Sequence, residues 1–280
     1  MEVSDNMCRA AALLEKHARF EIAHGRADSA LADAKAIYAE YQHVQSISPQ
    51  RSLMHLFSNL LPEVLNVVTR PEQLAGLEDL RGQDIRRDLQ RYLIESYASN
   101  LHWWDWGDKV QQEPSYSYKA WLPFHGMLFR VFVLADLMAD SYRTLQQQEK
   151  LAQEPFYTVK QKYSELVKTT SANEVAWWIY QIFAEAEARQ ELAHLGVAMT
   201  HYRLDHGALP ETLEALVPQY LDAVPTDPFD GKPLRLVLKG NQRVIYSVGP
   251  KGLDYQDTPI DRNGHGNITF ALTAPAAGGR

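Results

Sequence analysis

The stretch HYRLDHGALPETLEALVPQYLDAVPTDPFDGKPLRL, residues 201–236, marks the point where the chain changes from helical to turn-rich. Upstream of it, apolar residues recur every three or four positions and predict one long helix from Asn173 to about His206. Gly207 is a suitable C-terminal stop, and Pro210 follows three residues later. At 1.5 Å per residue, such a helix spans roughly 50 Å, which is long enough to join two parts of a protein.

Downstream of the long helix, the pattern predicts a short helix and a small sheet. LPETLEALVPQYL, residues 209–221, is typical of a short helix after a proline, and VPTDPFDGKP, residues 224–233, is dense in turn-forming residues. Three apolar runs predict strands, and Lys-Gly-Asn between the first two predicts a hairpin. The expected strands are Leu234–Leu238, Arg243–Val248 and Ile268–Leu272.

The region before the long helix is predicted to be helical almost throughout. A helix from Asn6 to His24 is followed by Gly25 as its stop, and Asp28 is a candidate N-cap for a second helix. Further helices are expected at Ser52–Thr69, Gly82–Tyr97, Phe124–Gln147 and Thr158–Lys168. The prediction is an α+β chain with a helical domain at 1–172 and a second module at 173–280.

The composition is that of a globular protein and excludes one class of partner. Of the 280 residues, 45% are apolar and 22% are charged, and the net charge of −7 disfavours nucleic-acid binding. No segment is typical of a signal peptide or a membrane span. Cys8 is the sole cysteine, so it forms no intrachain disulfide. An upstream leader or anchor would place the chain in the cell envelope or periplasm; without one it would be cytoplasmic.

The order of elements after the long helix resembles the soluble domain of type II secretion major pseudopilins. A Tyr-rich helix end with Asp-X-Gly, a proline-led short helix, an Asp-Pro-aromatic turn and VIYSVGPKGLDYQD (244–257) follow in the family's order. The matching residues are Tyr202, Asp205, Gly207, Pro210, Leu213, Leu216, Val217, Pro218, Tyr220, Pro225, Asp227, Pro228, Phe229, Gly231, Pro233, Ser247 and Gly249. The whole chain is also similar to uncharacterised bacterial proteins with a helical region before this module.

The resemblance implies a three-stranded sheet of pseudopilin type and a role in assembly, with one clear departure. Pseudopilins begin with a very hydrophobic helix behind a prepilin cleavage site, and they polymerise through that helix. Here about 170 residues precede the module, so polymerisation by this route is not expected. We therefore expect a non-catalytic binding or assembly module with a protein partner. The alternatives are a helical scaffold capped by the module and a metal-dependent enzyme.

An acidic loop after the hairpin is the candidate metal site. The family's corresponding loop binds calcium, and this loop offers hard oxygen donors from Asp254, Asp257, Asp261, Asn263 and Asn267. The alternative is a solvated turn in which Asp, Asn and Gly serve the loop geometry.

Two Glu-x-x-His pairs underlie the enzyme alternative. Glu21 with His24, and Glu191 with His194, have the spacing that di-iron helical bundles use. Salt-bridged surface pairs are the favoured explanation of the same spacing. No hydrolase elbow, phosphate-binding loop, zinc helix or dinucleotide fingerprint is present in the sequence, so no catalytic residue is assigned.

Aromatic residues gather in a predicted loop at 101–124, LHWWDWGDKVQQEPSYSYKAWLPF. Its tryptophans and tyrosines could stack against a sugar or a peptide, or they could cover a helical core where a long loop crosses it. Both interpretations stay open from the sequence.

Overall fold

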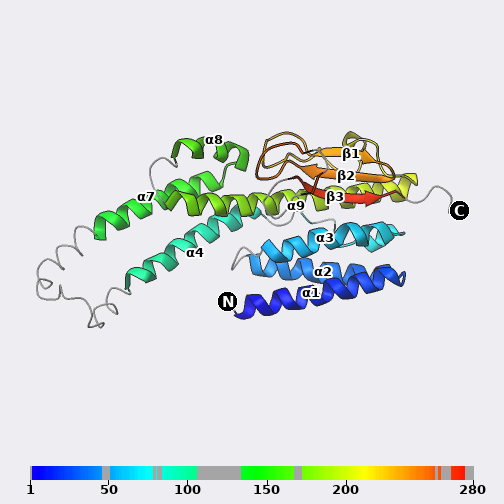
Figure 1. The fold of residues 1–280 in the computed structure, drawn as a ribbon, viewed down its shortest axis with the longest axis horizontal. Helices are drawn as coiled ribbons and strands as arrows, with labels where there is room; N and C mark the ends of the chain where they lie inside the picture. The colour runs from blue at the N-terminus through cyan, green and yellow to red at the C-terminus, as the bar shows by residue number, and fades with distance from the viewer. Residues whose placement is uncertain are drawn as a thin grey trace, which may run out of the picture. The chain divides into compact units, whose positions relative to one another are not determined.

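The computed structural model of the chain describes residues 2–45, 51–77, 80, 84–105, 134–166, 172–255, 258–259 and 266–274. It shows an α+β fold with a helical N-terminal region, as the sequence predicted (Figure 1). The helices are α1 (Glu2–Ala23), α2 (Ala27–Gln45), α3 (Arg51–Val67), η1 (Pro71–Leu74), α4 (Ile85–Asp105), α7 (Leu134–Ala152), α8 (Phe156–Leu166), α9 (Ala172–His206) and η5 (Leu213–Leu216). The strands are β1 (Arg235–Lys239), β2 (Gln242–Ser247) and β3 (Ile268–Thr273).

Contacts between residues divide the chain into two compact units. One unit joins Met1–Ile85 to Pro155–Arg280, and the other is Arg86–Glu154. This division differs from the sequence-based boundary at residue 172, because α3 packs against both α9 and β3. The N-terminal helices and the C-terminal module therefore belong to one unit. In the second unit, the side-chain amide of Gln90 on α4 donates to the carbonyl of Glu149 on α7 at 3.4 Å.

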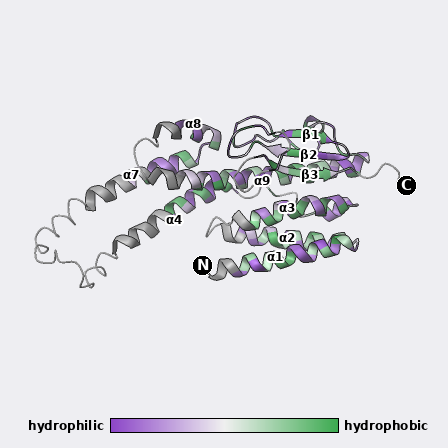
Figure 2. Cartoon of the chain, viewed as in Figure 1, coloured by the Kyte–Doolittle hydropathy of each residue, from purple (hydrophilic) through white to green (hydrophobic). Residues whose placement is uncertain are grey.

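Helices α1 and α2 form a helical hairpin. Its turn is a Schellman motif: the amide of Gly25 donates to the Ile22 carbonyl and the amide of Arg26 to the Glu21 carbonyl. Gly25 has a φ of 72°, which a residue without Cβ adopts at little cost. In Figure 2, apolar and polar residues alternate along these helices. The apolar stripe of α2 is buried; it comprises Leu31, Ala34, Tyr38 and Tyr41.

Helix α3 connects this hairpin to the C-terminal module. In Figure 1, α3 lies between α9 and the α1–α2 pair. The guanidinium of Arg203 on α9 donates to the carbonyls of Leu65 and Val68, each at 2.9 Å, and so caps the C-terminal end of α3. Oδ1 of Asn66 accepts a hydrogen bond from the backbone amide of Thr273, the last residue of β3. One end of α3 is thus bonded to both α9 and the sheet.

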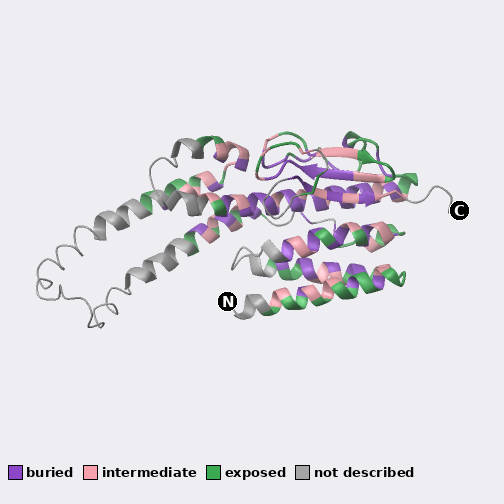
Figure 3. Ribbon diagram, viewed as in Figure 1, coloured by how far each residue is buried: buried purple, intermediate pink, exposed green. Residues whose placement is uncertain are grey.

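The sheet is antiparallel with the order β1-β2-β3, and it packs against the long helix. Strands β1 and β2 form the predicted hairpin, in which Val237 pairs with Val244, and Gly240 takes a φ of 60° in the turn. Ile245 of β2 pairs with Phe270 of β3, and both side chains are buried. Figure 3 shows that most of α9 beside the sheet is buried.

A glycine in α9 makes room for an aromatic ring of the sheet. A Cβ at Gly196 would lie 2.3 Å from Cε1 of Phe270, and the Phe270 ring is itself buried. This distance is far below a van der Waals contact, so the helix and β3 approach closely only because residue 196 has no side chain.

Replacement of Gly196 by alanine should therefore destabilise the protein, although alanine is favoured over glycine in helices by about 1 kcal/mol. Overpacking a core costs about 1–3 kcal/mol, and the clash with Phe270 should outweigh the gain in helix propensity. Urea unfolding would measure the change. The double variant Gly196→Ala, Phe270→Leu should recover stability relative to the sum of the single variants. Strictly additive effects would contradict the proposed clash.

Three local predictions were wrong. The short helix predicted at 209–221 is reduced to the four residues of η5, because Pro218 lacks an amide donor and favours extended backbone at Val217 before it. Residues 101–105 of the predicted aromatic loop belong to α4, and residues 106–124 lie outside the described residues. Asp28 lies in the first turn of α2 instead of at its N-cap.

Candidate functional site

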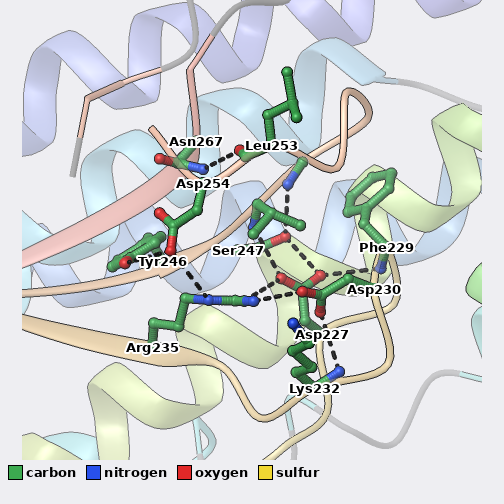
Figure 4. Close-up of polar contacts among 12 residues, drawn as sticks. Asp227, Phe229, Asp230, Lys232, Arg235, Tyr246, Ser247, Leu253, Asp254 and Asn267 are labelled. Carbon is green, nitrogen blue, oxygen red and sulfur yellow. Dashed lines mark hydrogen bonds and ion pairs between the residues drawn. The ribbon is translucent and has the colours of Figure 1, made fainter. Parts of the chain in front are cut away.

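A buried carboxylate organises the turn that follows η5. Asp227 has no exposed surface, and its side chain accepts four hydrogen bonds (Figure 4). Oδ1 accepts the amide of Phe229 at 3.0 Å and the hydroxyl of Ser247 at 2.8 Å. Oδ2 accepts the amide of Val248 at 2.8 Å and Nη1 of Arg235 at 3.2 Å. One side chain thus joins the turn to β1 and to the end of β2.

Arg235 links Asp227 to two more carboxylates. Its Nη2 donates to Asp230, and its Nε lies 3.6 Å from Oδ2 of Asp254. Burial raises the pKa of Asp227, and the charge of Asp230 acts in the same direction, whereas the hydrogen bonds from the amides and from Ser247 oppose the change. The side chain of Arg235 is 19% exposed and that of Asp227 is fully buried, so little solvent screens this pair.

The turn is also fixed by aromatic contacts. The ring of Phe229 meets that of Phe156 on α8 edge-on at 5.3 Å, and Phe156 stacks on Trp177 of α9 at 5.1 Å. Nearby, the ring of Tyr157 lies 3.1 Å from the position that a Cβ on Gly231 would take. Phe229 is thus a buried anchor of the turn. Its connection to α9 runs through Phe156 of α8. These contacts give the Asp227 cluster a structural role in the fold.

Tyr220 holds the segment after η5 against the end of α9. Its hydroxyl donates to Oδ2 of Asp205 at 2.7 Å, and its ring meets that of Tyr202 edge-on at 5.7 Å. Partial desolvation, with the hydrogen bond to Asp205, raises the pKa of Tyr220 to about 12. The tyrosine therefore stays protonated and keeps its hydrogen bond over the whole physiological range.

The predicted calcium ligands are only partly within the described residues. Asp254 is half-exposed; its Oδ2 accepts the Tyr246 hydroxyl at 3.4 Å. Asn267 is fully buried; its side-chain amide donates to the Leu253 carbonyl at 3.3 Å, and its Oδ1 has no hydrogen-bond partner in the described structure. The remaining three, Asp257, Asp261 and Asn263, lie outside the described residues.

Asn267 fits a cation site, and Asp254 fits it less well. A buried oxygen without a donor is costly unless something binds it, and a cation would satisfy Oδ1 of Asn267. Arg235 lies beside Asp254 and competes with a cation for that carboxylate. In the described parts of the chain, no three His, Cys, Asp or Glu residues are grouped so that they could hold a metal ion.

Glu21 lies on α1 and His24 in the turn after it, whereas Glu191 and His194 both lie on α9. Glu21 is buried and forms two hydrogen bonds with Arg26, from Nε at 2.5 Å and from Nη2 at 2.6 Å. His24 is exposed, and its Nδ1 lies 2.7 Å from the Phe20 carbonyl. Glu21 would have to leave Arg26 to become a metal ligand, so the structure adds nothing in favour of a di-iron site.

The Glu21–Arg26 pair should make stability depend on pH. The hydrogen bond from Arg26 lowers the pKa of Glu21 from 4.5 to about 2. A carboxyl with a lowered pKa stabilises the fold above its unfolded pKa, and this contribution is lost as the pH falls from about 4.5 to about 2.

The wild-type chain should consequently lose more stability between neutral and acidic pH than Glu21→Gln does. Urea unfolding at a series of pH values would measure the difference. Glu40→Gln, at an exposed position of α2, is the matched control and should follow the wild type. Parallel pH curves for the wild type and Glu21→Gln would show that the pair contributes nothing.

A second buried polar cluster lies between α3 and α9, and it was not predicted from the sequence. Glu185 accepts a hydrogen bond from Nη2 of Arg189 at 3.0 Å and lies 2.8 Å from Nε2 of His55. Nη1 of Arg189 donates to the hydroxyl of Ser58 at 3.0 Å. The spacing of Glu185 and Arg189, four residues apart inside an apolar helix, was the available signal. The cluster satisfies buried charges where the two helices meet.

Within the described ranges, no helix combines the length and the apolar character needed to cross a bilayer. Comparison of the chain with protein-family models, with curated proteins and with solved structures finds no match.

Proposed function

We propose that this chain is a non-catalytic binding or assembly module that acts through a protein partner. The observation that carries the proposal is the outer surface of α1. Leu13 is 67% exposed and Phe20 is 53% exposed, and they lie seven residues apart on one face of the helix. Single exposed apolar residues are common, but two large ones aligned on a regular helix favour an interaction surface.

The two buried polar clusters support the non-catalytic part of the proposal. The side chains around Asp227 are bonded to one another and to backbone groups that close the turn. Glu185 and Arg189 satisfy one another's charge between two helices. Each cluster has a clear role in the fold. The link to secretion or pilus-like machinery, and hence to the bacterial cell envelope, rests on the resemblance of residues 201–257 to pseudopilins.

Affinity capture with the purified full chain, followed by reconstitution with the captured protein, tests the proposal. Isothermal titration of the two purified proteins should give saturable binding, and the variant Leu13→Ala, Phe20→Ala reports whether α1 takes part. Captured proteins that fail to bind in the purified system would contradict the proposal, as would no capture above that of an unrelated helical protein.

A helical scaffold capped by the C-terminal module is the second candidate. It is favoured by the contacts of α3 with α9 and β3 and by the capping of α3 by Arg203. If the module only stabilises the helices, charged substitutions at its exposed residues Leu238 and Leu253 should leave partner binding unchanged. Loss of binding in Leu238→Glu or Leu253→Glu would instead assign the module a direct part in recognition.

We also propose that the acidic loop binds calcium, on the support of the buried Oδ1 of Asn267, which has no hydrogen-bond partner among the described residues. For a site with a Kd of roughly 0.1 mM, calcium at a hundredfold excess over Kd would stabilise the fold by about 2.7 kcal/mol. Calcium should therefore raise the Tm, and magnesium at the same concentration should raise it less. Asp254→Ala and Asp261→Ala should each abolish the calcium-dependent shift. A Tm that is unchanged at millimolar calcium would exclude the site.

A further inference from the structure

The exposed face of α1 has the residue spacing of a coiled-coil seam. Six exposed residues follow one another at steps of three and four; they are Asn6, Arg9, Leu13, Lys16, Phe20 and Ala23. In heptad terms, Leu13 and Phe20 occupy a positions, and Arg9 and Lys16 occupy d positions. Ala11 and Ala18, on the opposite side of the helix, are fully buried in the three-helix layer. Figure 3 shows the exposed residues along α1.

Two neighbouring side chains order the ring of Phe20 before any partner binds. The ring of His24 lies 4.1 Å from the Phe20 ring, and the guanidinium carbon of Arg26 is 5.5 Å from the centre of that ring. Arg26 is itself fixed by its two hydrogen bonds to the buried Glu21. An aromatic side chain that is ordered before binding loses less conformational entropy when a partner covers it.

The charged positions of the seam are the cationic residues Arg9 and Lys16. Arg19, beside the seam, is paired with Glu15 at 3.1 Å and with Glu63 at 3.1 Å. By contrast, neither Arg9 nor Lys16 forms an ion pair or hydrogen bond with any residue that the structure describes. This positive stripe lies on a chain with a net charge of −7, so its sign differs from that of the molecule as a whole.

We propose that the α1 seam docks an acidic amphipathic helix of another protein. Its apolar residues would pack against Leu13 and Phe20, and its carboxylates would lie opposite Arg9 and Lys16. The seam covers residues 6–23, so the partner helix would contribute about 27 Å, or roughly 18 residues, at a crossing angle of about 20°. This inference rests on the proposed binding function and specifies the chemistry of the partner.

Charge disfavours a second copy of the chain as the occupant. In a parallel pair of α1 helices, Arg9 would face Arg9 and Lys16 would face Lys16, and like charges in facing positions repel. In an antiparallel pair, the apolar a positions would face the cationic d positions. A membrane surface is also disfavoured, because the seam offers only Leu13 and Phe20 as large apolar groups.

A designed peptide of about 20 residues, with Leu at a, Glu at d and Ala or Gln elsewhere, serves as the probe. Fluorescence anisotropy should show that it binds the full chain, and that a matched peptide with Lys at d binds at least about tenfold more weakly. Phe20→Ala should weaken binding of the acidic peptide by about tenfold or more. The variant Arg9→Glu, Lys16→Glu should reverse the preference between the two peptides. Arg9, Lys16 and Phe20 are all exposed, so circular dichroism should show an unchanged fold for these variants.

Equal affinity for the two peptides, or no binding of the acidic peptide, would overturn the proposal. So would a dimer in sedimentation equilibrium that Phe20→Ala dissociates, or binding to phosphatidylserine vesicles that the same variant abolishes. The capture experiment distinguishes failure of the α1 seam from failure of the proposed binding function. A partner retained equally by the wild type and by Leu13→Ala, Phe20→Ala would remove the seam and leave the binding function in place.

Discussion

Asp227→Ala should be the most destabilising single substitution in the C-terminal module, with a loss of about 3–5 kcal/mol. The substitution leaves Arg235 without one of its carboxylate partners and leaves the amides of Phe229 and Val248 without an acceptor. Buried donors without acceptors carry a full desolvation penalty. In a chain of this size, the expected fall in Tm is roughly 10 °C.

Two further variants make this prediction specific. Asp227→Asn keeps the size of the side chain but replaces one acceptor oxygen by a donor, so it should also be strongly destabilising. Asp254→Ala is the matched control, because its half-exposed carboxylate contacts the same Arg235 and should contribute at most about 1 kcal/mol. Urea unfolding measures all three. A cost below about 1 kcal/mol for Asp227→Ala would contradict the role given to this residue.

Arg203→Met should give the second large effect, a loss of about 2–3 kcal/mol. Arg203 is buried, burial lowers its pKa, and its guanidinium donates to the carbonyls of Leu65 and Val68. Methionine retains much of the length and apolar volume of the side chain, so the loss reports mainly the two hydrogen bonds and the charge at the end of α3. Thermal and urea unfolding would measure it.

Arg70→Met is the matched control for Arg203→Met. Arg70 pairs with Asp28 at 3.0 Å, but both side chains are more than half exposed, so the loss should be at most about 1 kcal/mol. Similar losses of unfolding free energy in the two variants would show that burial of Arg203 adds nothing to stability. In that case Arg203 would not hold α3 against α9.

The elements themselves could be predicted because their signals are local. The start and end of α9 follow from an apolar period of 3.6 residues and from Gly207, and the β1–β2 hairpin follows from Gly240 between two apolar runs. Similarly, Gly25 marks the turn of the α1–α2 hairpin. Each of these signals lies within a few residues of the feature that it specifies.

What the sequence could not supply were contacts between distant residues. Nothing local indicates that Arg203 caps α3, 138 residues away, or that Gly196 leaves space for Phe270. The grouping of α1–α3 with the C-terminal module depends on such contacts, whereas the boundary at residue 172 was placed at the start of the long helix. Asp227 matched the family pattern, but its four hydrogen bonds became visible only in the fold.

The α1 seam was missed for a different reason. Leu13 and Phe20 fit an amphipathic helix in the sequence, and a helix of this kind is normally expected to bury its large apolar residues. In the structure the alanines Ala11 and Ala18 face the core instead, and the two large residues face outward. Only the packing of α1 against its neighbours shows which of its faces is exposed.

Native-state hydrogen exchange tests the central structural claim most directly, namely that α3, α9 and the sheet form one cooperative unit. Peptides from α3, β2 and β3 should then exchange through openings of the same free energy. Arg203→Met should lower that free energy by the same amount in all three. If α3 instead exchanges freely while β2 and β3 keep their full protection, the N-terminal helices and the module are separate units, and the account is contradicted.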